Sequence, residues 1–532
     1  MVLDESTELS IPSESQYVVP GDLSPEAITG SLQAILPTRH HPIGRHRFTL
    51  LDTFDGRVRR AGARLTRAGG QSASLLEWRP RGGGTRLAVR LKQPVGFAWD
   101  LPDGPLQQAV APVIGVRRLL AQVDAEASGS LLDVLDRRSK TVARLRIETG
   151  HVRPPQSHGA WQPLPTMLTL TALRGYEDVY EQLVPVIESR PGVRSCPEGL
   201  DGVMRRRIGT LELGDLSSPR VDLDPTIRAD VGARQIHRAL LSTLEANEPG
   251  LRANLDTEFL HDFRVTLRRT RSLLGQIKHV FPPEATAHFS TEFSWLGRLA
   301  GPLRDVDVLV LALRERRDDL PGADMEALLA FLGQVQLQEH HALVSASDSD
   351  RYHRLLSEWE AFLNRPAPPK AEGRNAERLL AEVVSQRAWR LSRRIASSAE
   401  DIDEHTAPAR LHEVRIAAKK LRYLIDVTPA FYDEADLACI LGALKKLQRV
   451  LGDFNDAQVQ ETRLLDYGRA LGAAGGPPGA LLALGRLAEQ TCQRRDRLRG
   501  QVVDTLSRFR ARTTRSACRR AFKEAGPGGA AR

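Results

Sequence analysis

This chain contains few aromatic residues and few cysteines. Aromatic side chains make up 5% of its 532 residues, and the four cysteines are Cys196, Cys439, Cys492 and Cys518. Because they are widely separated and form neither a CxxC pair nor a Cys/His cluster, we expect isolated thiols in a reducing compartment rather than a disulfide framework or a zinc site. The scarcity of aromatics argues against sequence-tolerant binding of single-stranded nucleic acid, which interleaves stacking rings with cations.

A long apolar segment is also absent. The sequence has no run of about 18 apolar residues, the length that a membrane-spanning helix requires. The amino-terminal stretch MVLDESTELSIPSESQ is polar and acidic, without the apolar core of a secretion signal. We therefore expect a soluble cytoplasmic protein that is neither secreted nor inserted in a membrane.

Positive charge is in moderate excess. Lys and Arg number 75 against 66 Asp and Glu, which gives a net charge of +9, and the sequence pI is near 9.6. For a chain of this length the excess is modest, so the arrangement of the cations is more informative than their total.

Two patterns divide the chain. Up to residue 214, β-like stretches such as TRLAVRLKQ and KTVARLRIE alternate with Gly- and Pro-rich turns and two amphipathic stretches, GPLQQAVAPVIGVRRLLAQ and YEDVYEQLVPVIESR. This predicts an α+β domain with a curved antiparallel sheet or barrel. Beyond the linker, helical periodicity predicts an all-α domain. The expected segments are a disordered polar lead-in (1–40), the α+β domain (41–214), a linker (215–227), the all-α domain (228–520, with halves 228–364 and 374–520 joined by 365–373) and a flexible tail (521–532).

The all-α region repeats itself at a spacing of 151 residues. Apolar positions agree between the copies, as with Val265 and Ile416, but so does a set of basic residues, which an ordinary core would not preserve. The matched polar pairs are His261 with His412, Arg264 with Arg415, Arg268 with Lys419, Arg269 with Lys420, Arg271 with Arg422, Arg298 with Arg449, Gly301 with Gly452 and Asp305 with Asp456. Matched cations on duplicated helical hairpins indicate a pseudo-symmetric site for an anion larger than one phosphate.

A helical wheel places the first set on one face. At about 100° per residue, His261, Arg264, Arg268 and Arg271 share a sector of roughly 80°, and the stripe runs about 15 Å. Apolar residues border it and should enter the core, whereas Arg269 lies off the stripe. In the second copy His412, Arg415, Lys419 and Arg422 form the equivalent stripe, and Lys420 lies off it. A stripe of this length suits a linear polyanion.

The alternative interpretation is a solvated helix face, which is the usual meaning of a single charged stripe. Each stripe lacks the interleaved Glu of a solubility face, and like charges one turn apart repel unless something neutralises them. Asp305 and Asp456 could each hold an arginine of the stripe. The pair His261–Asp262 suggests a metal site, but Asp262 becomes Glu413 in the other copy and points about 100° away from the histidine.

A basic carboxy-terminal helix follows the second copy. Ten arginines and two aspartates lie between Arg494 and Arg520. This segment either extends the anion-binding surface or is a terminal bundle helix with a basic outer face.

These residues resemble a known family. HDFRVTLRRTR followed by LGRLAGPLRDVDVL, and LHEVRIAAKKLRYLI followed by LKKLQRVLGDFNDAQV, are similar to the two halves of a CHAD domain (conserved histidine α-helical domain). The resemblance implies two pseudo-symmetric helical bundles and a basic central groove that binds inorganic polyphosphate, with possible association with polyphosphate granules. The binding residues it implies are His261, Arg264, Arg268, Arg269, Arg271, Arg298, His412, Arg415, Lys419, Lys420, Arg422 and Arg449, with Arg304, Lys445 and Lys446 as further candidates.

The amino-terminal domain resembles a CYTH (triphosphate tunnel) domain through LLDTFDGRVRRAGARLTR and DVLDRRSKTVARLRIE. Catalysis in that family needs inward carboxylates for a divalent metal, typically on an ExExK strand. The expected strand, ILPTRHHPIGRHRFTL, contains no Glu, and Glu77 and Glu148 alone do not make a metal site. We therefore expect a catalytically degenerate domain without metal or cofactor, whose cations Arg86, Arg90 and Lys92, and Lys140, Arg144 and Arg146, either bind phosphates or face solvent.

The sequence thus favours non-catalytic binding of inorganic polyphosphate. Two alternatives stay open: a metal-dependent triphosphatase or adenylate cyclase in the CYTH-like domain, and nonspecific nucleic-acid binding, because phosphate contacts alone can supply affinity for duplex DNA.

Overall fold

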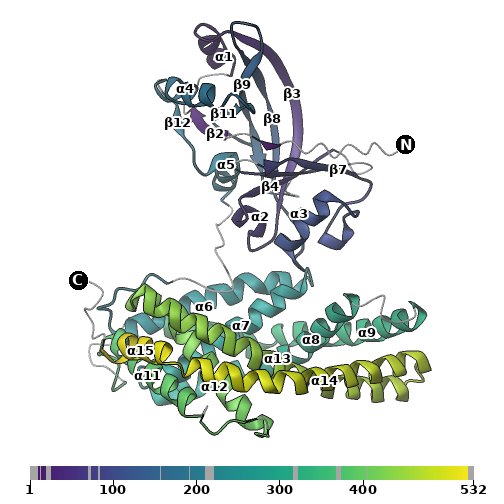
Figure 1. Ribbon diagram of the computed structural model, residues 1–532, viewed down its shortest axis with the longest axis vertical. Coiled ribbons are helices and arrows are strands. Elements are labelled where there is room, and N and C mark those ends of the chain that lie inside the picture. Colours follow the sequence, from purple (N-terminus) through teal and green to yellow (C-terminus); the bar gives the residue numbers. More distant parts are fainter. Residues whose placement is uncertain are drawn as a thin grey trace. The chain divides into compact units, whose positions relative to one another are not determined.

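The computed structural model describes residues 10–11, 14–19, 25–69, 74–81, 84–155, 157, 159–190, 192–209, 221–315, 322–366, 373–398, 400–403 and 405–524. The chain divides into two compact units, residues 1–215 and 216–532 (Figure 1). Among the described residues, no helix combines the length and the apolar character needed to span a lipid bilayer.

The first unit is built on an antiparallel sheet, as the sequence predicts. Within its described residues ten strands form one sheet in the order β12-β2-β11-β9-β8-β3-β4-β5-β7, with β10 paired to β9. Two further strands, β1 and β6, pair separately. The strands are β1 (Ser10–Ile11), β2 (Glu14–Val19), β3 (Thr38–Asp52), β4 (Ala63–Gly69), β5 (Ser74–Pro80), β6 (Gly84–Thr85), β7 (Leu87–Leu91), β8 (Leu120–Leu135), β9 (Thr141–Arg153), β10 (Gln162–Pro163), β11 (Thr166–Ala172) and β12 (Arg194–Ser195).

Short helices cover parts of this sheet. Apolar residues of α1 and α4, among them Leu32 and Ile187, pack with the sheet residues Leu145 and Leu168 in one core, and α3 contributes Val110 to a second core. The helices are α1 (Pro25–Gln33), α2 (Arg57–Arg60), α3 (Pro105–Ile114), α4 (Glu177–Glu188) and α5 (Gly199–Arg207).

Two boundary predictions need correction. The lead-in 1–40 is not disordered throughout: β2 pairs with β11, and α1 buries Ile28 and Leu32 in the core. Within the predicted flexible tail 521–532, residues 521–524 are helical, and Phe522 is buried and packs edge-on against Tyr432; residues 525–532 lie outside the described residues. Residues 215–220 of the linker and 367–372 of the junction lie outside the described residues.

The second unit is helical and is built from a repeat. Its first three helices each have a counterpart that begins 151 residues later: α6 and α11, α7 and α12, and α8 and α13. Each of the three also packs against its own counterpart. The helices are α6 (Ala229–Arg252), α7 (Thr257–Gln276), α8 (Pro283–Arg314), α9 (Gly322–Ser347), α10 (Asp350–Asn364), α11 (Leu380–Ser398), α12 (Pro408–Val427), α13 (Glu434–Ala473), α14 (Pro478–Phe509) and α15 (Arg512–Arg519).

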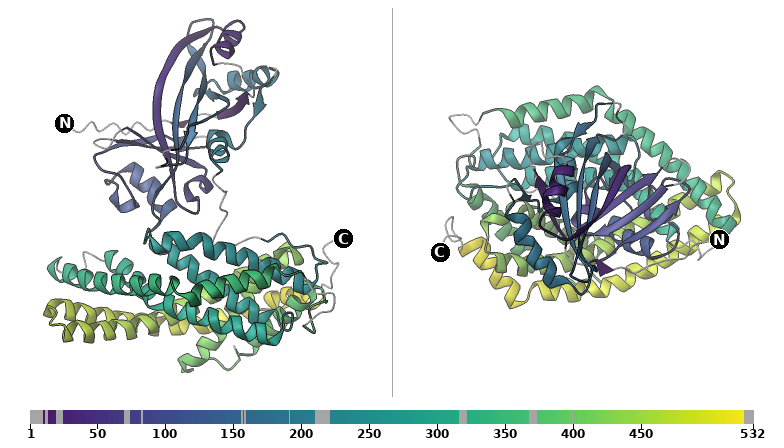
Figure 2. Two further views of the ribbon diagram at one scale, coloured as in Figure 1. Left: turned by 180° about the vertical axis from the view of Figure 1, so that it is seen from behind. Right: turned by 90° about the horizontal axis from the view of Figure 1, so that it is seen from above.

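Reciprocal hydrogen bonds place a pseudo-two-fold axis between the halves. The Ala229 N–H donates to the Arg378 carbonyl at 2.8 Å, and the Leu380 N–H donates to the Ile227 carbonyl at 2.9 Å. These four residues are two pairs of repeat equivalents, so each bond is the image of the other under the 151-residue shift. An isologous contact of this kind is the signature of two-fold symmetry. In Figure 2 the α8–α9 and α13–α14 hairpins run side by side, one from each half.

The amphipathic pattern of α7 and α12 sets their orientation. The predicted core positions Leu260, Phe263 and Leu267 of α7 are buried, as are Leu411 and Leu421 of α12. The side chain of Asp256 caps α7 by accepting hydrogen bonds from the N–H groups of Glu258 and Phe259. Burial of the apolar face leaves the basic stripe of each helix at its edge.

Candidate anion-binding site

The first basic stripe lies along α7 and reaches over α8. Arg268 and Arg271 are exposed, and Arg264 is partly buried. Glycine at two positions of α8 makes room for them: a Cβ on Gly301 would lie 3.3 Å from Arg264 Nη1, and one on Gly297 would lie 3.4 Å from Arg271 Nη1. The absence of these side chains lets both guanidinium groups lie against the neighbouring helix.

The second stripe lies along α12 and is held by polar partners on α13. His412 Nδ1 and Asn455 Oδ1 form a hydrogen bond of 2.7 Å. Arg415 pairs with Asp456 at 3.3 Å, and Arg422 donates to Gln448 Oε1 at 3.3 Å. The prediction that Asp456 holds an arginine of its stripe is thus confirmed.

The two stripes meet where α7 packs against α12. Arg268 acts electrostatically on both Arg415 and Lys419, although it belongs to the other half of the repeat. Burial, followed by the positive charges of Arg415 and Arg268, lowers the pKa of Lys419 to about 8. We call Arg264, Arg268, Arg415 and Lys419 the central cluster.

Little negative charge neutralises the central cluster. Asp305, the counterpart of Asp456, forms its ion pair with Arg463 at 3.2 Å, and from there its charge partly offsets the lowering of the Arg264 pKa. Among the described residues, neither Arg268 nor Lys419 has an ion-pair partner, and Arg264 Nη1 is buried without a hydrogen-bond partner. Burial, followed by the charge of Arg268, lowers the pKa of Arg264 to about 10. A cluster of cations that repel one another is ready to accept an anion.

Other predicted residues extend or flank the cluster. Arg298 lies near Arg271, whose pKa is lowered by burial and then by the charge of Arg298. Lys445, Lys446 and Arg449 are exposed on α13. His261 lies one turn before Arg264 and is partly buried.

Three predicted residues have partners or neighbours outside the central cluster, although the charge of Arg304 also acts on Arg264. Arg269 is buried, pairs with Asp426 of the other half at 3.5 Å and lies over the ring of Tyr423, so it ties the halves together. Arg304 donates to the carbonyl of Thr257 at 3.1 Å and pairs with Glu258, so it fastens α8 to the start of α7.

Lys420, the third of these predicted residues after Arg269 and Arg304, faces other cations. Its pKa is lowered by burial and then by the charges of Arg387, Arg394 and Lys278. The basic residues of α11 are not among those predicted from the sequence. The signal was available: LAEVVSQRAWRLSRRIASS contains four arginines and one acidic residue.

The first unit holds its predicted acids in ion pairs. Glu77 of β5 pairs with Arg86 and with Arg79, and Glu148 of β9 pairs with Arg146 at 2.9 Å. From the sequence we expect the ExExK position in ILPTRHHPIGRHRFTL, most of which forms β3. An earlier strand of the sheet, β2 (ESQYVV), precedes it. When β2 is aligned with the ExExK pattern, Glu14 matches the first glutamate, but Gln16 replaces the second glutamate and Val18 replaces the lysine. The described residues contain no group of three or more His, Cys, Asp or Glu that could hold a metal ion.

Comparison with known proteins identifies part of this chain. Residues 235–465 match the family of the CHAD domain, and the chain thus contains a CHAD domain. A relative, the uncharacterized protein Rv2226 of Mycobacterium tuberculosis (strain ATCC 25618 / H37Rv), is 26% identical over 322 residues, which are 59% of each chain. This chain therefore spans about three fifths of the length of the curated relatives that it matches.

Solved structures resemble each unit separately. The CHAD domain from the plant Ricinus communis is 26% identical, with a TM-score of 0.46, and the match covers 54% of this chain and 94% of that one. HpAC1 from Hippeastrum, described as having a dominant triphosphatase activity, is 12% identical with a TM-score of 0.26, over 38% of this chain and 99% of that one.

Proposed function

We propose that the CHAD domain of this chain binds inorganic polyphosphate without chemical conversion, through the central cluster and the stripes that extend from it. The observation that carries this proposal is the approach of Arg268 to Arg415 and Lys419, which combines the two stripes into one positive region. The proposed contacts are His261, Arg264, Arg268, Arg271 and Arg298 from the first half and His412, Arg415, Lys419, Arg422 and Arg449 from the second, with Lys445 and Lys446 at the margin.

The chemistry of these side chains suits a chain of phosphates. Guanidinium groups present several N–H donors to phosphate oxygens, and lysine adds a point charge. Arg264 offers a buried N–H without a partner. A ligand oxygen at this atom would satisfy the donor and offset the repulsion from Arg268.

The residues around the cluster disfavour a ligand with bases. The aromatic residues on α7 and α12 are Phe259 and Phe263, which are buried, and Tyr423, which lies under Arg269. A single-strand nucleic-acid site would present rings to stack the bases. Duplex DNA, which needs only phosphate contacts, is the competitor that an experiment must exclude.

Charge reversal in both stripes tests this proposal. The double variant Arg264→Glu with Arg415→Glu is compared with Arg238→Glu with Arg486→Glu, which changes the charge equally at exposed residues of α6 and α14. We expect the first variant to lose about 3 to 6 kcal/mol of polyphosphate binding free energy with unchanged helicity, since each of the two lost charge-assisted contacts contributes about 1.5 to 3 kcal/mol. Equal affinities of the two variants would contradict the proposal.

A further inference from the structure

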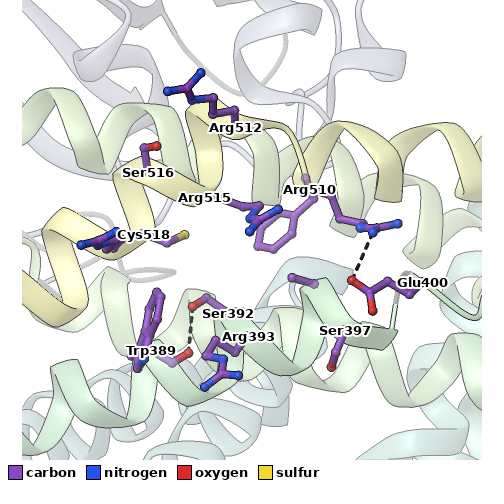
Figure 3. A pocket seen from close by; sticks show the side chains of 13 residues that line it. Trp389, Ser392, Arg393, Ser397, Glu400, Arg510, Arg512, Arg515, Ser516 and Cys518 are labelled. Atoms are coloured by element: carbon purple, nitrogen blue, oxygen red, sulfur yellow. Dashed lines mark hydrogen bonds and ion pairs between the residues drawn. The ribbon is translucent and has the colours of Figure 1, made fainter.

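A separate cavity lies between α11 and α15, and no residue of the central cluster lines it. It has a volume of about 800 Å³ and is enclosed by α11 and by the end of α14 together with α15 (Figure 3). None of its lining residues belongs to α7 or α12. Its volume is within the range of about 300 to 1,000 Å³ that small-molecule sites occupy.

The cavity is lined by far more positive than negative charge. Five arginines line it, against the single carboxylate of Glu400. Arg510 forms an ion pair with the Glu400 carboxylate at 3.1 Å, and Arg519 forms one with Glu524. Within the described part of the chain, Arg393, Arg512 and Arg515 have no ion-pair partner. Three uncompensated guanidinium groups around one cavity are suited to binding phosphate groups.

An aromatic surface distinguishes this cavity from the central cluster. Trp389, which is only partly buried, and Phe509 line it beside the arginines. In Figure 3 the ring of Trp389 stands toward α15 and the sulfur of Cys518 turns to the same space, while Arg515 reaches inward from α15. Burial raises the pKa of the Cys518 thiol to about 12, so the thiol adds no negative charge. The wall therefore offers a planar apolar surface next to cations.

We propose that this cavity is a second ligand site that binds a small phosphorylated molecule with a planar ring, the chemistry of a nucleotide. Arg393, Arg512 and Arg515 would hold its phosphate groups, and the ring would lie against Trp389. This assignment uses none of the residues of the central cluster, so it does not depend on polyphosphate binding there.

Calorimetric titration of the full chain with ATP, GTP and inorganic tripolyphosphate tests the proposal. We expect ATP or GTP to bind more tightly than tripolyphosphate. Arg515→Glu should weaken nucleotide binding about tenfold or more, on the scale of a lost charge-assisted hydrogen bond. Trp389→Leu should reduce nucleotide affinity and leave tripolyphosphate affinity unchanged, and Trp389→Phe should restore part of the loss. The matched control is Arg508→Glu, an exposed residue of α14 that does not line the cavity.

Several outcomes would overturn this assignment. Absence of nucleotide binding to the folded wild-type chain would do so, and so would nucleotide affinity that is equal in Arg515→Glu and Arg508→Glu. In the full chain carrying Arg264→Glu and Arg415→Glu, which disables the central cluster, tripolyphosphate binding as tight as ATP and insensitive to Trp389 would show that no ring is recognised. The double variant of the central cluster separates the two sites, since it should impair polyphosphate binding and leave nucleotide binding intact.

Discussion

Arg268 and Lys419 occupy equivalent positions of the repeat, on two helices that pack against each other, and the charge of Arg268 contributes to lowering the pKa of Lys419 to about 8. Two cations that sequence alone places 151 residues apart therefore belong to one electrostatic site. The pseudo-two-fold axis explains why: a residue close to such an axis is also close to its own counterpart. Duplication thus concentrates positive charge where the halves meet.

The lowered pKa of Lys419 predicts that polyphosphate affinity depends on pH. Bound phosphate favours the charged amine of Lys419 and raises its pKa. Below pH 8 the amine is already protonated, and above it binding must take up a proton. Affinity should therefore fall about tenfold between pH 7 and pH 9, since one pH unit above the pKa leaves about a tenth of the amine charged.

Lys419→Arg provides the control, because a guanidinium stays charged throughout this range. Dissociation constants measured at pH 7 and 9 at fixed ionic strength should then differ little in the variant. A variant with the same pH dependence as the wild type would assign the effect to another group.

Arg269 should matter for stability and not for ligand binding. Its pair with Asp426 joins the two halves and is largely buried, and removal of Arg269 leaves the buried Asp426 carboxylate with Arg422 as its remaining ion-pair partner among the described residues. We expect Arg269→Ala to lower the free energy of unfolding by about 2 to 4 kcal/mol, measured by urea denaturation. Polyphosphate affinity of the folded variant should match that of Arg508→Ala. A large loss of affinity in Arg269→Ala alone would show that Arg269 contacts the ligand.

His237 should make the helical unit sensitive to acid. It is fully buried against Trp359, neither ring nitrogen has a hydrogen-bond partner, and burial lowers its pKa to about 3. In the unfolded chain the His237 imidazole takes up a proton near pH 6.5, whereas in the folded chain it stays neutral down to about pH 3. The free energy of unfolding is therefore highest above pH 6.5 and decreases as the pH falls toward 3. The loss amounts to about 2 kcal/mol between pH 7 and pH 5.

His237→Phe should remove that part of the pH dependence, which thermal unfolding at both pH values can measure. The exposed His341→Gln serves as the control. Equal pH dependence in His237→Phe and the wild type would show that the lost stability arises from other groups.

The first unit should not hydrolyse triphosphate. Arginines already engage Glu77 and Glu148, and β2 has Gln16 where the ExExK pattern has its second glutamate. With Mg²⁺ or Mn²⁺ and tripolyphosphate, we expect the wild type to release no more phosphate than a Glu77→Gln, Glu148→Gln double variant. Robust release that the double variant abolishes would instead support the triphosphatase alternative.

The sequence predicts those features that depend on periodicity. The 151-residue spacing appears directly in the starts of α6 and α11, α7 and α12, and α8 and α13, and the apolar faces of α7 and α12 are buried as a helical wheel predicts. The antiparallel sheet is also confirmed. Helical and strand periods are local properties, which is why sequence reveals them.

Features that depend on distant partners were missed. Short β2 is held by pairing with β11, about 150 residues away, and LAQ, the end of the amphipathic stretch GPLQQAVAPVIGVRRLLAQ, begins the strand β8. Arg269 was grouped with its neighbours in the chain, but its environment is set by Asp426 of the other half. The cavity beside Trp389 likewise arises from segments more than 100 residues apart.

The central claim is that both stripes contact one polyanion, and the salt dependence of binding tests it most directly. The slope of log affinity against log salt concentration reports how many cations engage the ligand. For long-chain polyphosphate we predict that Arg264→Glu and Arg415→Glu each reduce the magnitude of this slope and that duplex DNA does not displace the ligand at equal phosphate concentration. If only one of the two reversals changes the slope, or if DNA displaces polyphosphate, the account of a single shared site is contradicted.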